Sequence, residues 1–397
     1  MILVIAEKPS VAQSIAKVLG ATSRKDGYME GGNYIVSWCF GHLVELADAS
    51  SYDERYAKWR YDDLPIVPEN WMFEVTKDKA QQFKVLSSLM KDKRVTDLVC
   101  ATDSGREGEL IFRLVYNKAG CTKPFKRLWI SSLEDSAIRE GFQHLRDGKE
   151  YDRLYEAALS RSKADWIVGI NGTRLFTTLY HKKLVVGRVQ TPTLAMLVER
   201  DGKISTFHKE KYFNVHVGKG DLTADLEKVK TEEEAKRIAA ACEKKQAVVS
   251  SLKRETKTVN PPKLYDLTTL QREANRYYGF TAQQTLDLVQ TLYEKKLLTY
   301  PRTDSQFITD DMEDTARQVI SIVCRQFPLF SGVLVTPDIA RVTDNSNVTD
   351  HHAILPTVQL EKQDVSALPQ SEQKILNLVG MRLLCATGEK HTYAETQ

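Results

Sequence analysis

Several common signals are missing from this sequence, and each absence narrows what the chain can do. No run of about 18 consecutive apolar residues occurs, so we expect no membrane-spanning helix. The apolar opening stretch Met1–Ala6 is too short for a signal-peptide core, and Glu7 and Lys8 follow it at once. The six cysteines are scattered without a Cys-x-x-Cys pair, which predicts no zinc site and reduced thiols in a cytosol.

Nucleotide-binding and long-range charge signals are also missing. No Gly-x-x-x-x-Gly-Lys-Ser/Thr sequence is present, so the chain has no P-loop and we expect no nucleotide cofactor. The 56 basic and 53 acidic residues leave a formal net charge of only +3. Any surface that binds nucleic acid must therefore be a local patch and not a field of the whole molecule.

What the chain does contain is typical of a soluble globular protein, with 42% hydrophobic and 27% charged residues. Its length of 397 residues predicts two or three domains. Over the first 150 residues or so, apolar runs alternate with helical periodicity. We expect strands over Ile2–Ala6, Tyr34–Trp38, Thr96–Ala101 and Arg127–Ile130, and helices from Pro9 and over Ala80–Met90, Glu109–Asn117 and Leu133–Leu145. This alternation predicts an α/β domain with a largely parallel sheet.

The rest of the chain is mostly helical. Helical periodicity covers Tyr151–Tyr180, and Phe207–Val249 mixes short alternating strands, such as the one ending at Ala247-Val248-Val249, with a charged helix over Thr231–Lys245. The polar stretch Lys253–Lys263 is typical of a linker. From Leu264 onward helices dominate, and one over Ala282–Lys295 leads directly to Tyr300.

Tyr300 lies in the segment Thr299-Tyr300-Pro301-Arg302-Thr303-Asp304-Ser305. Pro301 cannot donate to a strand ladder, so Tyr300 should stand at the end of an element. Arg302 can hold a phosphate through a bidentate, charge-assisted pair. A phenol beside a guanidinium can attack a phosphodiester, although a core tyrosine beside a surface arginine would give the same pattern.

Three carboxylates follow predicted strands. Glu7 comes just after the first strand, and Asp103 and Glu107 follow the strand that ends at Ala101. Because sites in open parallel sheets lie at the carboxyl ends of strands, these oxygens could form a Mg²⁺ site. A solvated acidic turn before a helix is the alternative. Lys8, next to Glu7, could donate a proton or hold a phosphate, or it could be an ordinary surface lysine.

Other residues suggest contacts with nucleic acid. Gly187 before Arg188 lets a backbone approach a phosphate, although a buried structural arginine fits equally well. Trp59, Trp166 and Arg174 could stack on bases or contact phosphates, or pack in a core. The pair His351-His352 lacks a nearby soft ligand, so action on a phosphate is more economical than a metal site.

Six segments occur together in one order along nearly the whole chain. They are Ala6-Glu7-Lys8-Pro9-Ser10, Asp103 to Glu109, Gly187 to Pro192, Gln290-x-Leu292-Tyr293-Glu294, Thr299 to Ser305 and His351 to Thr357. Each alone is moderately specific, but six in order are highly specific. With them, the chain resembles the type IA DNA topoisomerases.

The resemblance implies a multi-domain architecture. It implies an α/β Toprim domain with a parallel-rich sheet over residues 1–150, a helical DNA-binding segment over 151–202, a partial β arch over 203–258 and a helical domain with the catalytic tyrosine over 259–397. The chain is shorter than the family's ring of domains, so it is expected to be an amino-terminal portion with an incomplete arch.

The resemblance also implies roles for single residues. Tyr300 would be the nucleophile that forms a 5′-phosphotyrosine bond, Arg302 would fix the scissile phosphate, and Lys8 would aid proton transfer to the leaving 3′-oxygen. His351 would support the site, and Glu7 would act in catalysis and, with Asp103 and Glu107, hold Mg²⁺. The DNA-contacting positions would be Trp59, Trp166, Arg174, Val185, Val186, Gly187, Arg188, Val189, Gln190 and Arg302, and Gln290 and Glu294 would lie near the tyrosine.

One departure from the family's pattern concerns the metal. Many members carry Asp-x-Asp-x-Glu, whereas Gly105 takes the middle position here, which puts a second ion in doubt. The expected activity is ATP-independent cutting, passage and resealing of DNA by a monomer that binds mainly single strands. The alternatives are a DNA-binding fragment that cannot turn over, and a Toprim-bearing primase or nuclease that would not need Tyr300.

Overall fold

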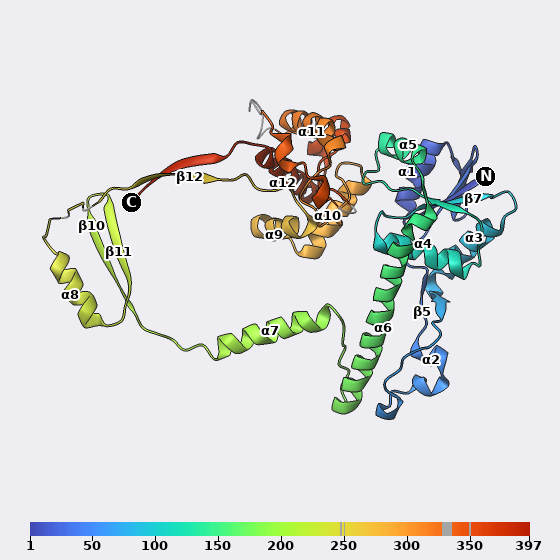
Figure 1. The fold of residues 1–397 in the computed structure, drawn as a ribbon, viewed down its shortest axis with the longest axis horizontal. Helices are drawn as coiled ribbons and strands as arrows, with labels where there is room; N and C mark the ends of the chain where they lie inside the picture. Colours follow the sequence, from blue (N-terminus) through green and yellow to red (C-terminus); the bar gives the residue numbers. More distant parts are fainter. Residues whose placement is uncertain (247, 250, 328–335, 349–350) are drawn as a thin grey trace. The chain divides into compact units, whose positions relative to one another are not determined.

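The computed structural model describes residues 1–246, 248–249, 251–327, 336–348 and 351–397 (Figure 1). The chain divides into two units, one of residues Met1–Leu184 with Val259–His391 and one of Val185–Thr258 with Thr392–Gln397. We call residues 1–151 of the first unit the α/β region and residues 259–391 its helical region. Among the helices described, none is both long enough and apolar enough to cross a membrane.

A seven-stranded sheet forms the centre of the α/β region, in the order β2-β3-β4-β1-β7-β8-β9. The four central strands β4, β1, β7 and β8 are parallel, and antiparallel strands complete both edges. The strands are β1 (Ile2–Ala6), β2 (Ser23–Lys25), β3 (Tyr28–Gly31), β4 (Tyr34–Trp38), β7 (Asp97–Ala101), β8 (Phe125–Arg127) and β9 (Arg146–Asp147). The predicted α/β fold with a parallel-rich sheet is confirmed.

Helices cover both faces of this sheet, as the pleat of the strands requires. Along β1, Leu3 and Ile5 join a core with α3 (Ala80–Lys91) and α4 (Arg106–Lys118). Val4 and Ala6 join a second core with α1 (Pro9–Leu19) and α5 (Asp135–Gln143). Because successive side chains point to opposite faces, a strand that is apolar throughout must be covered on both sides.

Most of the predicted elements in this region match the observed bounds within a few residues. One strand does not: the prediction placed it over Arg127–Ile130, whereas β8 ends at Arg127. Residues 128–130 are apolar because Leu128 and Ile130 pack beneath α5 in the second core, not because they extend the ladder. Burial alone does not distinguish a strand from a buried loop.

A small lobe and a long helix extend the α/β region (Figure 1). The lobe contains β5 (Val44–Leu46), α2 (Ala49–Tyr52) and β6 (Phe73–Val75), with β5 and β6 antiparallel. Helix α6 (Asp152–Tyr180) contacts the lobe, since the Asn171 amide bonds both backbone groups of Ile66. The helix predicted over Tyr151–Tyr180 is thus confirmed.

The helical region has its own apolar core, built mainly from four helices. They are α9 (Leu267–Tyr278), α10 (Ala282–Glu294), α11 (Glu313–Gln326) and α12 (Gln370–Ala386). Thr281 caps α10 in a reciprocal capping box with Gln284, which fixes where the helix begins. The helix predicted over Ala282–Lys295 is confirmed, and its end sets the position of the segment that follows.

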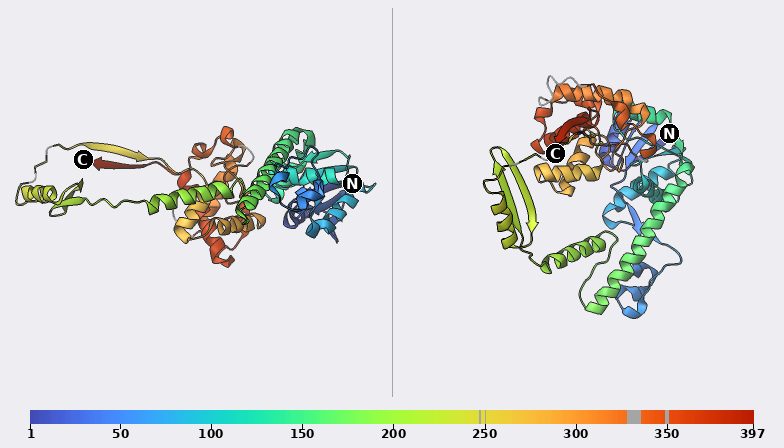
Figure 2. Two further views of the ribbon diagram at one scale, coloured as in Figure 1. Left: turned by 90° about the horizontal axis from the view of Figure 1, so that it is seen from below. Right: turned by 60° about the vertical axis from the view of Figure 1, so that its left-hand side comes forward.

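The second unit contains helices α7 (Gln190–Ser205) and α8 (Glu232–Cys242) and three strands, β10 (Phe213–Lys219), β11 (Leu222–Val229) and most of β12 (Arg254–Val259). Strands β10 and β11 form one two-stranded sheet, and β12 pairs with β13 (His391–Thr396) in another. Strands β12 and β13 lie side by side in every view (Figure 2). The charged helix predicted over Thr231–Lys245 is α8.

One prediction for this unit was wrong, and another falls partly outside the described residues. The stretch Lys253–Lys263 is not simply a linker, because it contains β12. Its partner β13 lies far along the chain, and Lys253 and Gln397 exchange both backbone hydrogen bonds at 2.8 Å, a pairing that no local pattern reveals. Ala247, predicted within a strand, lies outside the described residues, and Val248 and Val249 belong to no strand. Within the described residues, the sheets β10–β11 and β12–β13 have two strands each, so each strand has one neighbour.

Candidate active site

Four adjacent parallel strands each lead into a residue of one polar site at the carboxyl edge of the sheet. Glu7 follows β1, Asp103 follows β7, His42 follows β4 and Ser131 follows β8. Side chains of the first three line a hollow of about 450 Å³. The remaining lining includes Lys8, Glu107, Tyr300, Arg302 and His351. The topology therefore brings most of the predicted catalytic residues together, as expected for this edge of a parallel sheet.

Tyr300 enters this site from the helical region. Helix α10 ends at Glu294, and the buried pair Leu297 and Leu298 carries the chain into the core. Lys296 adopts a positive φ of 63° and its ammonium lies 2.6 Å from Asp135 of the α/β region. Tyr300 then lies outside any helix or strand, as predicted, with its ring at 8% exposure.

The Tyr300 hydroxyl donates a hydrogen bond of 2.9 Å to Oδ2 of Asp103. Burial, helped by the charges of Asp103 and Glu7, raises the pKa of the Tyr300 phenol well above its usual value. The phenol is therefore protonated at neutral pH in this arrangement. Arg302, which lines the same hollow, opposes this shift.

Glu7 and Asp103 form a close pair of buried carboxyls. The Asp103 backbone N–H donates to Oε2 of Glu7 at 3.3 Å. Burial, followed by the charge of Asp103, raises the pKa of Glu7 to about 7. Burial likewise raises the pKa of Asp103. Two oxygen donors that repel each other suit a hard divalent cation, so this pair fits Mg²⁺.

Glu107 is differently placed. Its carboxylate lies 3.5 Å from Arg161 of α6 and 3.8 Å from His42. The interaction with His42 is the main cause that lowers the pKa of Glu107. Within the described ranges, no three His, Cys, Asp or Glu side chains are grouped closely enough to hold a metal ion. A role for Glu107 as a ligand stays a prediction.

Lys8 also has a partner from the helical region. Its ammonium lies 3.5 Å from Oε1 of Glu294, and the Gln290 amide donates to the same oxygen at 2.9 Å. Gln290 and Glu294 thus lie beside Lys8, and their expected position near the tyrosine stays a prediction. The side chain of Lys8 remains about one-third exposed at the wall of the hollow.

The two adjacent histidines have different surroundings. His351 lines the hollow and its ring centroid lies 4.3 Å from that of Tyr300. Burial, with the neighbouring His352, lowers the pKa of His351 to about 4, so its imidazole is neutral near pH 7. His352 instead bonds through Nδ1 to the Ala353 carbonyl at 2.8 Å. Of the two histidines, His351 is the one that lines the hollow with Tyr300.

Arg127 lies beneath the site with its side chain fully buried. Its guanidinium donates to the carbonyls of Thr102 at 2.7 Å and Asp103 at 2.6 Å. Its Nε lies 3.1 Å from the equally buried carboxylate of Glu109 on α4. This buried pair holds the backbone that carries Asp103, and sequence reasoning missed it because a charged residue within a strand is usually exposed.

The predicted DNA-contacting residues of the first unit have mixed surroundings. Trp166 is partly buried, bonds the Ala47 carbonyl at 2.9 Å and packs edge-on against Tyr52 and Trp71. Arg174 is buried and donates to the Tyr56 carbonyl. Its guanidinium carbon lies 5.4 Å from the ring of Trp59, which is 41% exposed. Of the two tryptophans, Trp59 offers the more open face for stacking.

Residues 185–190, the other predicted DNA-contacting positions, belong to the second unit. Val185 and Val189 are more than half exposed. The Gly187 backbone N–H donates to Oγ1 of Thr191 at 3.1 Å, which fixes the turn before α7. Gly187 itself is half-buried, and the predicted approach of its backbone to a phosphate stays a prediction.

His42, Arg161 and Ser131 belong to the site but were not predicted. His42 and Ser131 follow central parallel strands, so the rule that located Glu7 and Asp103 could have found them. Arg161 lies within the long helix α6, and only the tertiary contact with Glu107 reveals it. A local pattern carries no signal for such a residue.

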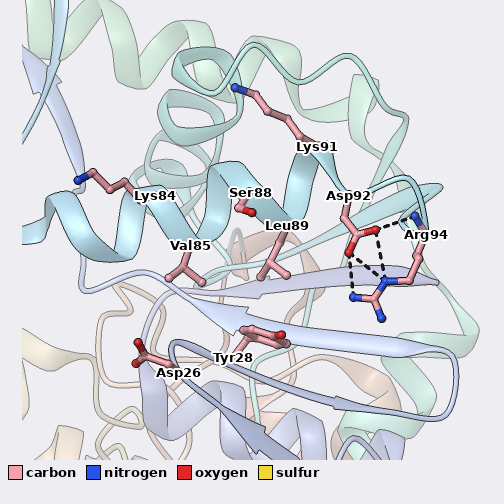
Figure 3. A pocket seen from close by; sticks show the side chains of 9 residues that line it. All are labelled: Asp26, Tyr28, Lys84, Val85, Ser88, Leu89, Lys91, Asp92 and Arg94. Carbon is pink, nitrogen blue, oxygen red and sulfur yellow. Dashed lines mark hydrogen bonds and ion pairs between the residues drawn. The ribbon is translucent and has the colours of Figure 1, made fainter.

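A second hollow, of about 670 Å³, lies against α3 (Figure 3). It contains none of the residues discussed above. Two of its charged lining residues, Asp92 and Arg94, pair at 2.8 Å, and Arg94 also pairs with Glu30 outside the lining at 2.8 Å. It is lined by Asp26, Tyr28, Lys84, Val85, Ser88, Leu89, Lys91, Asp92 and Arg94. We assign it no function.

Comparisons with known proteins identify the family of this chain. A DNA topoisomerase family model matches residues 149–397, and a Toprim domain model matches residues 2–133. DNA topoisomerase 3 of Bacillus subtilis (strain 168) is 42% identical over 407 residues, covering 100% of this chain and 56% of that protein. DNA topoisomerase 3 of Staphylococcus haemolyticus is 42% identical over 399 residues, covering 98% and 56%. The chain thus spans about half the length of the curated relatives it matches.

A solved structure shows the same fold. Full-length topoisomerase I from Thermotoga maritima is 25% identical, with a TM-score of 0.72 over 99% of this chain and 62% of that one. The family model covers more than half of the present sequence and includes Tyr300 and His351. The Toprim model includes Glu7 and Asp103. These matches show that this chain belongs to the DNA topoisomerase family, in its type IA branch.

Proposed function

We propose that the chain cuts one strand of DNA through a covalent 5′-phosphotyrosine at Tyr300 and rejoins it without a nucleotide cofactor. The observation that carries this proposal is the 2.9 Å hydrogen bond from the Tyr300 hydroxyl to Asp103, inside a hollow that Arg302 and His351 also line. A phenol held among a carboxylate, a guanidinium and an imidazole is the arrangement that transfer of a phosphodiester requires.

The chemistry can be assigned to the residues in the hollow. The phenol oxygen attacks the phosphorus and the bond from phosphorus to the 3′-oxygen breaks. Asp103 accepts the phenol proton along the existing hydrogen bond, and Lys8 supplies a proton to the departing 3′-oxygen. Arg302 holds the phosphate oxygens by charge. In rejoining, the 3′-hydroxyl attacks the phosphotyrosine and the protons return, so no external energy source is needed.

Glu7 and Asp103 are the residues that we propose hold Mg²⁺. A bound Mg²⁺ would supply positive charge to the phosphate and to its own carboxylate ligands. Arg127 and Glu109 would keep the Asp103 backbone in position beneath it. Glu107 is held by His42 and Arg161, so we propose it as a weaker contributor.

DNA is the proposed substrate, chiefly as single strands, bound by a monomer. The exposed ring of Trp59 beside the Arg174 guanidinium supports stacking of bases along this unit. Because the relatives are nearly twice as long, we propose that strand passage belongs to a longer protein. The present chain taken alone should cleave single strands but should not relax supercoiled plasmid efficiently.

The test is a covalent adduct with a labelled single-stranded oligonucleotide. Wild-type chain should become attached to the 5′-phosphate side of the cut, and Tyr300→Phe should give no adduct. Tyr293→Phe, which changes the neighbouring buried tyrosine, is the matched control and should retain it. An adduct formed by Tyr300→Phe would overturn the assignment. Cleavage without any adduct would favour a Toprim nuclease.

A further inference from the structure

Ser131 makes two contacts that link the Toprim domain to the tyrosine. It follows β8 in the turn before α5, and its carbonyl accepts the Tyr300 backbone N–H at 3.3 Å. Its Oγ lies 3.1 Å from Nδ1 of His351. One half-buried serine therefore holds both the backbone of the proposed nucleophile and the ring of the histidine beside it.

The other nitrogen of His351 is unsatisfied. Nε2 is buried and makes no hydrogen bond of good geometry within the residues that the structure describes, although a backbone contact with Ser104 also acts on the pKa of this imidazole. A buried polar nitrogen without a hydrogen-bond partner destabilises the folded protein, unless a substrate group forms that hydrogen bond. Since His351 lines the hollow with Tyr300 and Arg302, a phosphate oxygen could be a further partner for this ring beside the Ser104 backbone.

The hydrogen bond between Ser131 and Nδ1 can run in either direction, and each direction gives Nε2 a different role. A neutral imidazole carries one proton, so one nitrogen donates and the other accepts. If Ser131 donates its hydroxyl proton to Nδ1, the ring proton is on Nε2 and Nε2 is a donor. If Ser131 accepted from Nδ1, Nε2 would be a bare acceptor and would repel a phosphate oxygen. Only the first arrangement is useful beside a phosphodiester.

We propose that Ser131 is a positioning residue that sets the Nε2–H tautomer of His351, making the histidine a neutral hydrogen-bond donor to the phosphate. This inference rests on the proposed function for its substrate, but the tautomer is a property of the free protein. The contact orients the ring through its far nitrogen, as hydrogen bonds to functional histidines commonly do. Ser131 acts through His351 and does not touch the substrate itself.

The first measurement is ¹⁵N NMR of the His351 imidazole in the 397-residue chain without DNA. Wild type should show a protonated Nε2 and an unprotonated Nδ1 near pH 7. Ser131→Ala should shift the ring toward a mixture of tautomers, and Ser131→Thr, which keeps a hydroxyl, should restore the wild-type pattern. A wild-type Nδ1–H tautomer, or a spectrum unchanged in Ser131→Ala, would overturn the proposal. This readout is independent of DNA cleavage, so it separates the proposal from the proposed function.

The second measurement is oligonucleotide cleavage. Ser131→Ala should lower the rate constant of adduct formation about tenfold, the loss of roughly one useful hydrogen bond, with DNA affinity changed less than about twofold. Ser131→Thr should recover most of the rate. Ser132→Ala, which loses contacts to the Glu134 backbone N–H and carboxyl but none to His351, is the matched control and should remain near wild type. In a His351→Ala background, Ser131→Ala should add nothing, and a fully additive loss would show a merely structural role.

Discussion

Tyr300 and Asp103 are separated by 197 positions in sequence, yet the phenol of one donates a 2.9 Å hydrogen bond to the carboxylate of the other. The Toprim domain supplies the carboxylate at the end of β7, and the helical region supplies the phenol just beyond α10. The site is therefore assembled only while these two regions are in contact. A motion that separated the two regions would break this bond.

The pKa of Glu7 predicts a pH-dependent stability. A carboxyl in an unfolded chain has a pKa of about 4.3, and that of Glu7 is raised to about 7. Between these values the folded chain holds a proton that the unfolded chain lacks, so the free energy of unfolding falls as the pH rises. Glu7→Gln should therefore raise that free energy at pH 8, by up to about 3 kcal/mol, and leave it unchanged near pH 4.

Urea denaturation at several pH values checks this. Glu45→Gln, at an exposed position on β5, is the control and should be near neutral throughout. A variant whose advantage over wild type does not grow between pH 4 and pH 8 would contradict the raised pKa.

Gly105 predicts how many ions bind. With glycine at this position, calorimetric titration of Mg²⁺ into the wild-type chain should follow a one-site curve. Gly105 has an extended φ of 168°, and a Cβ built there meets no atom within 4 Å, so Gly105→Asp should fold normally. The added carboxylate should tighten Mg²⁺ binding about tenfold or create a second site, because affinity follows the number of charged ligands. Gly105→Asn, uncharged and of similar size, is the control, and two strong sites in wild type would refute the prediction.

Gly108, unlike Gly105, is a position where a side chain should not be tolerated. A Cβ there would lie 2.1 Å from the Asp103 carbonyl oxygen, which Arg127 also holds at 2.6 Å. Gly108→Ala should destabilise the fold by about 1–3 kcal/mol and reduce adduct formation more than tenfold, because the backbone of Asp103 must shift. Gly105→Ala, three residues away, should change the free energy of unfolding by less than about 0.5 kcal/mol. Thermal melts and cleavage assays on both variants decide this, and equal behaviour would argue against the close approach.

Substitution of Trp59 should mainly affect DNA binding, and substitution of Trp166 should mainly affect stability. Trp59→Ala should weaken binding to a single-stranded oligonucleotide by about 1–3 kcal/mol while the melting temperature changes little, because its ring is open to solvent. Trp166→Ala should mainly lower the melting temperature, since its indole packs against Tyr52 and Trp71. Fluorescence anisotropy and thermal melts measure the two quantities. Binding to single strands should also exceed binding to duplex at moderate salt, and equal affinity would count against a stacking surface.

The sequence determined by itself the elements and the chemical identity of most of the site. The spacing of apolar residues predicted the central strands and helices, because an element that is buried on one or both faces needs apolar residues at regular positions. The rule that sites follow the carboxyl ends of parallel strands selected Glu7 and Asp103, and Pro301 fixed Tyr300 at the end of an element. These inferences depend on residues close together in sequence, where local physics is sufficient.

Only the tertiary structure decided which distant groups meet. Pairing of β12 with β13 turned a predicted linker into a strand, because a backbone with free hydrogen-bonding groups is completed by a partner far along the chain. Glu107 contacts Arg161, and Ser131 contacts His351. Neither contact could be predicted, because the sequence around one residue contains no information about its distant partner. The raised pKa of Glu7 also arises from three-dimensional packing, because Glu7 is buried beside Asp103. Desolvation depends on all the atoms that surround a group in space and not on its neighbours in sequence.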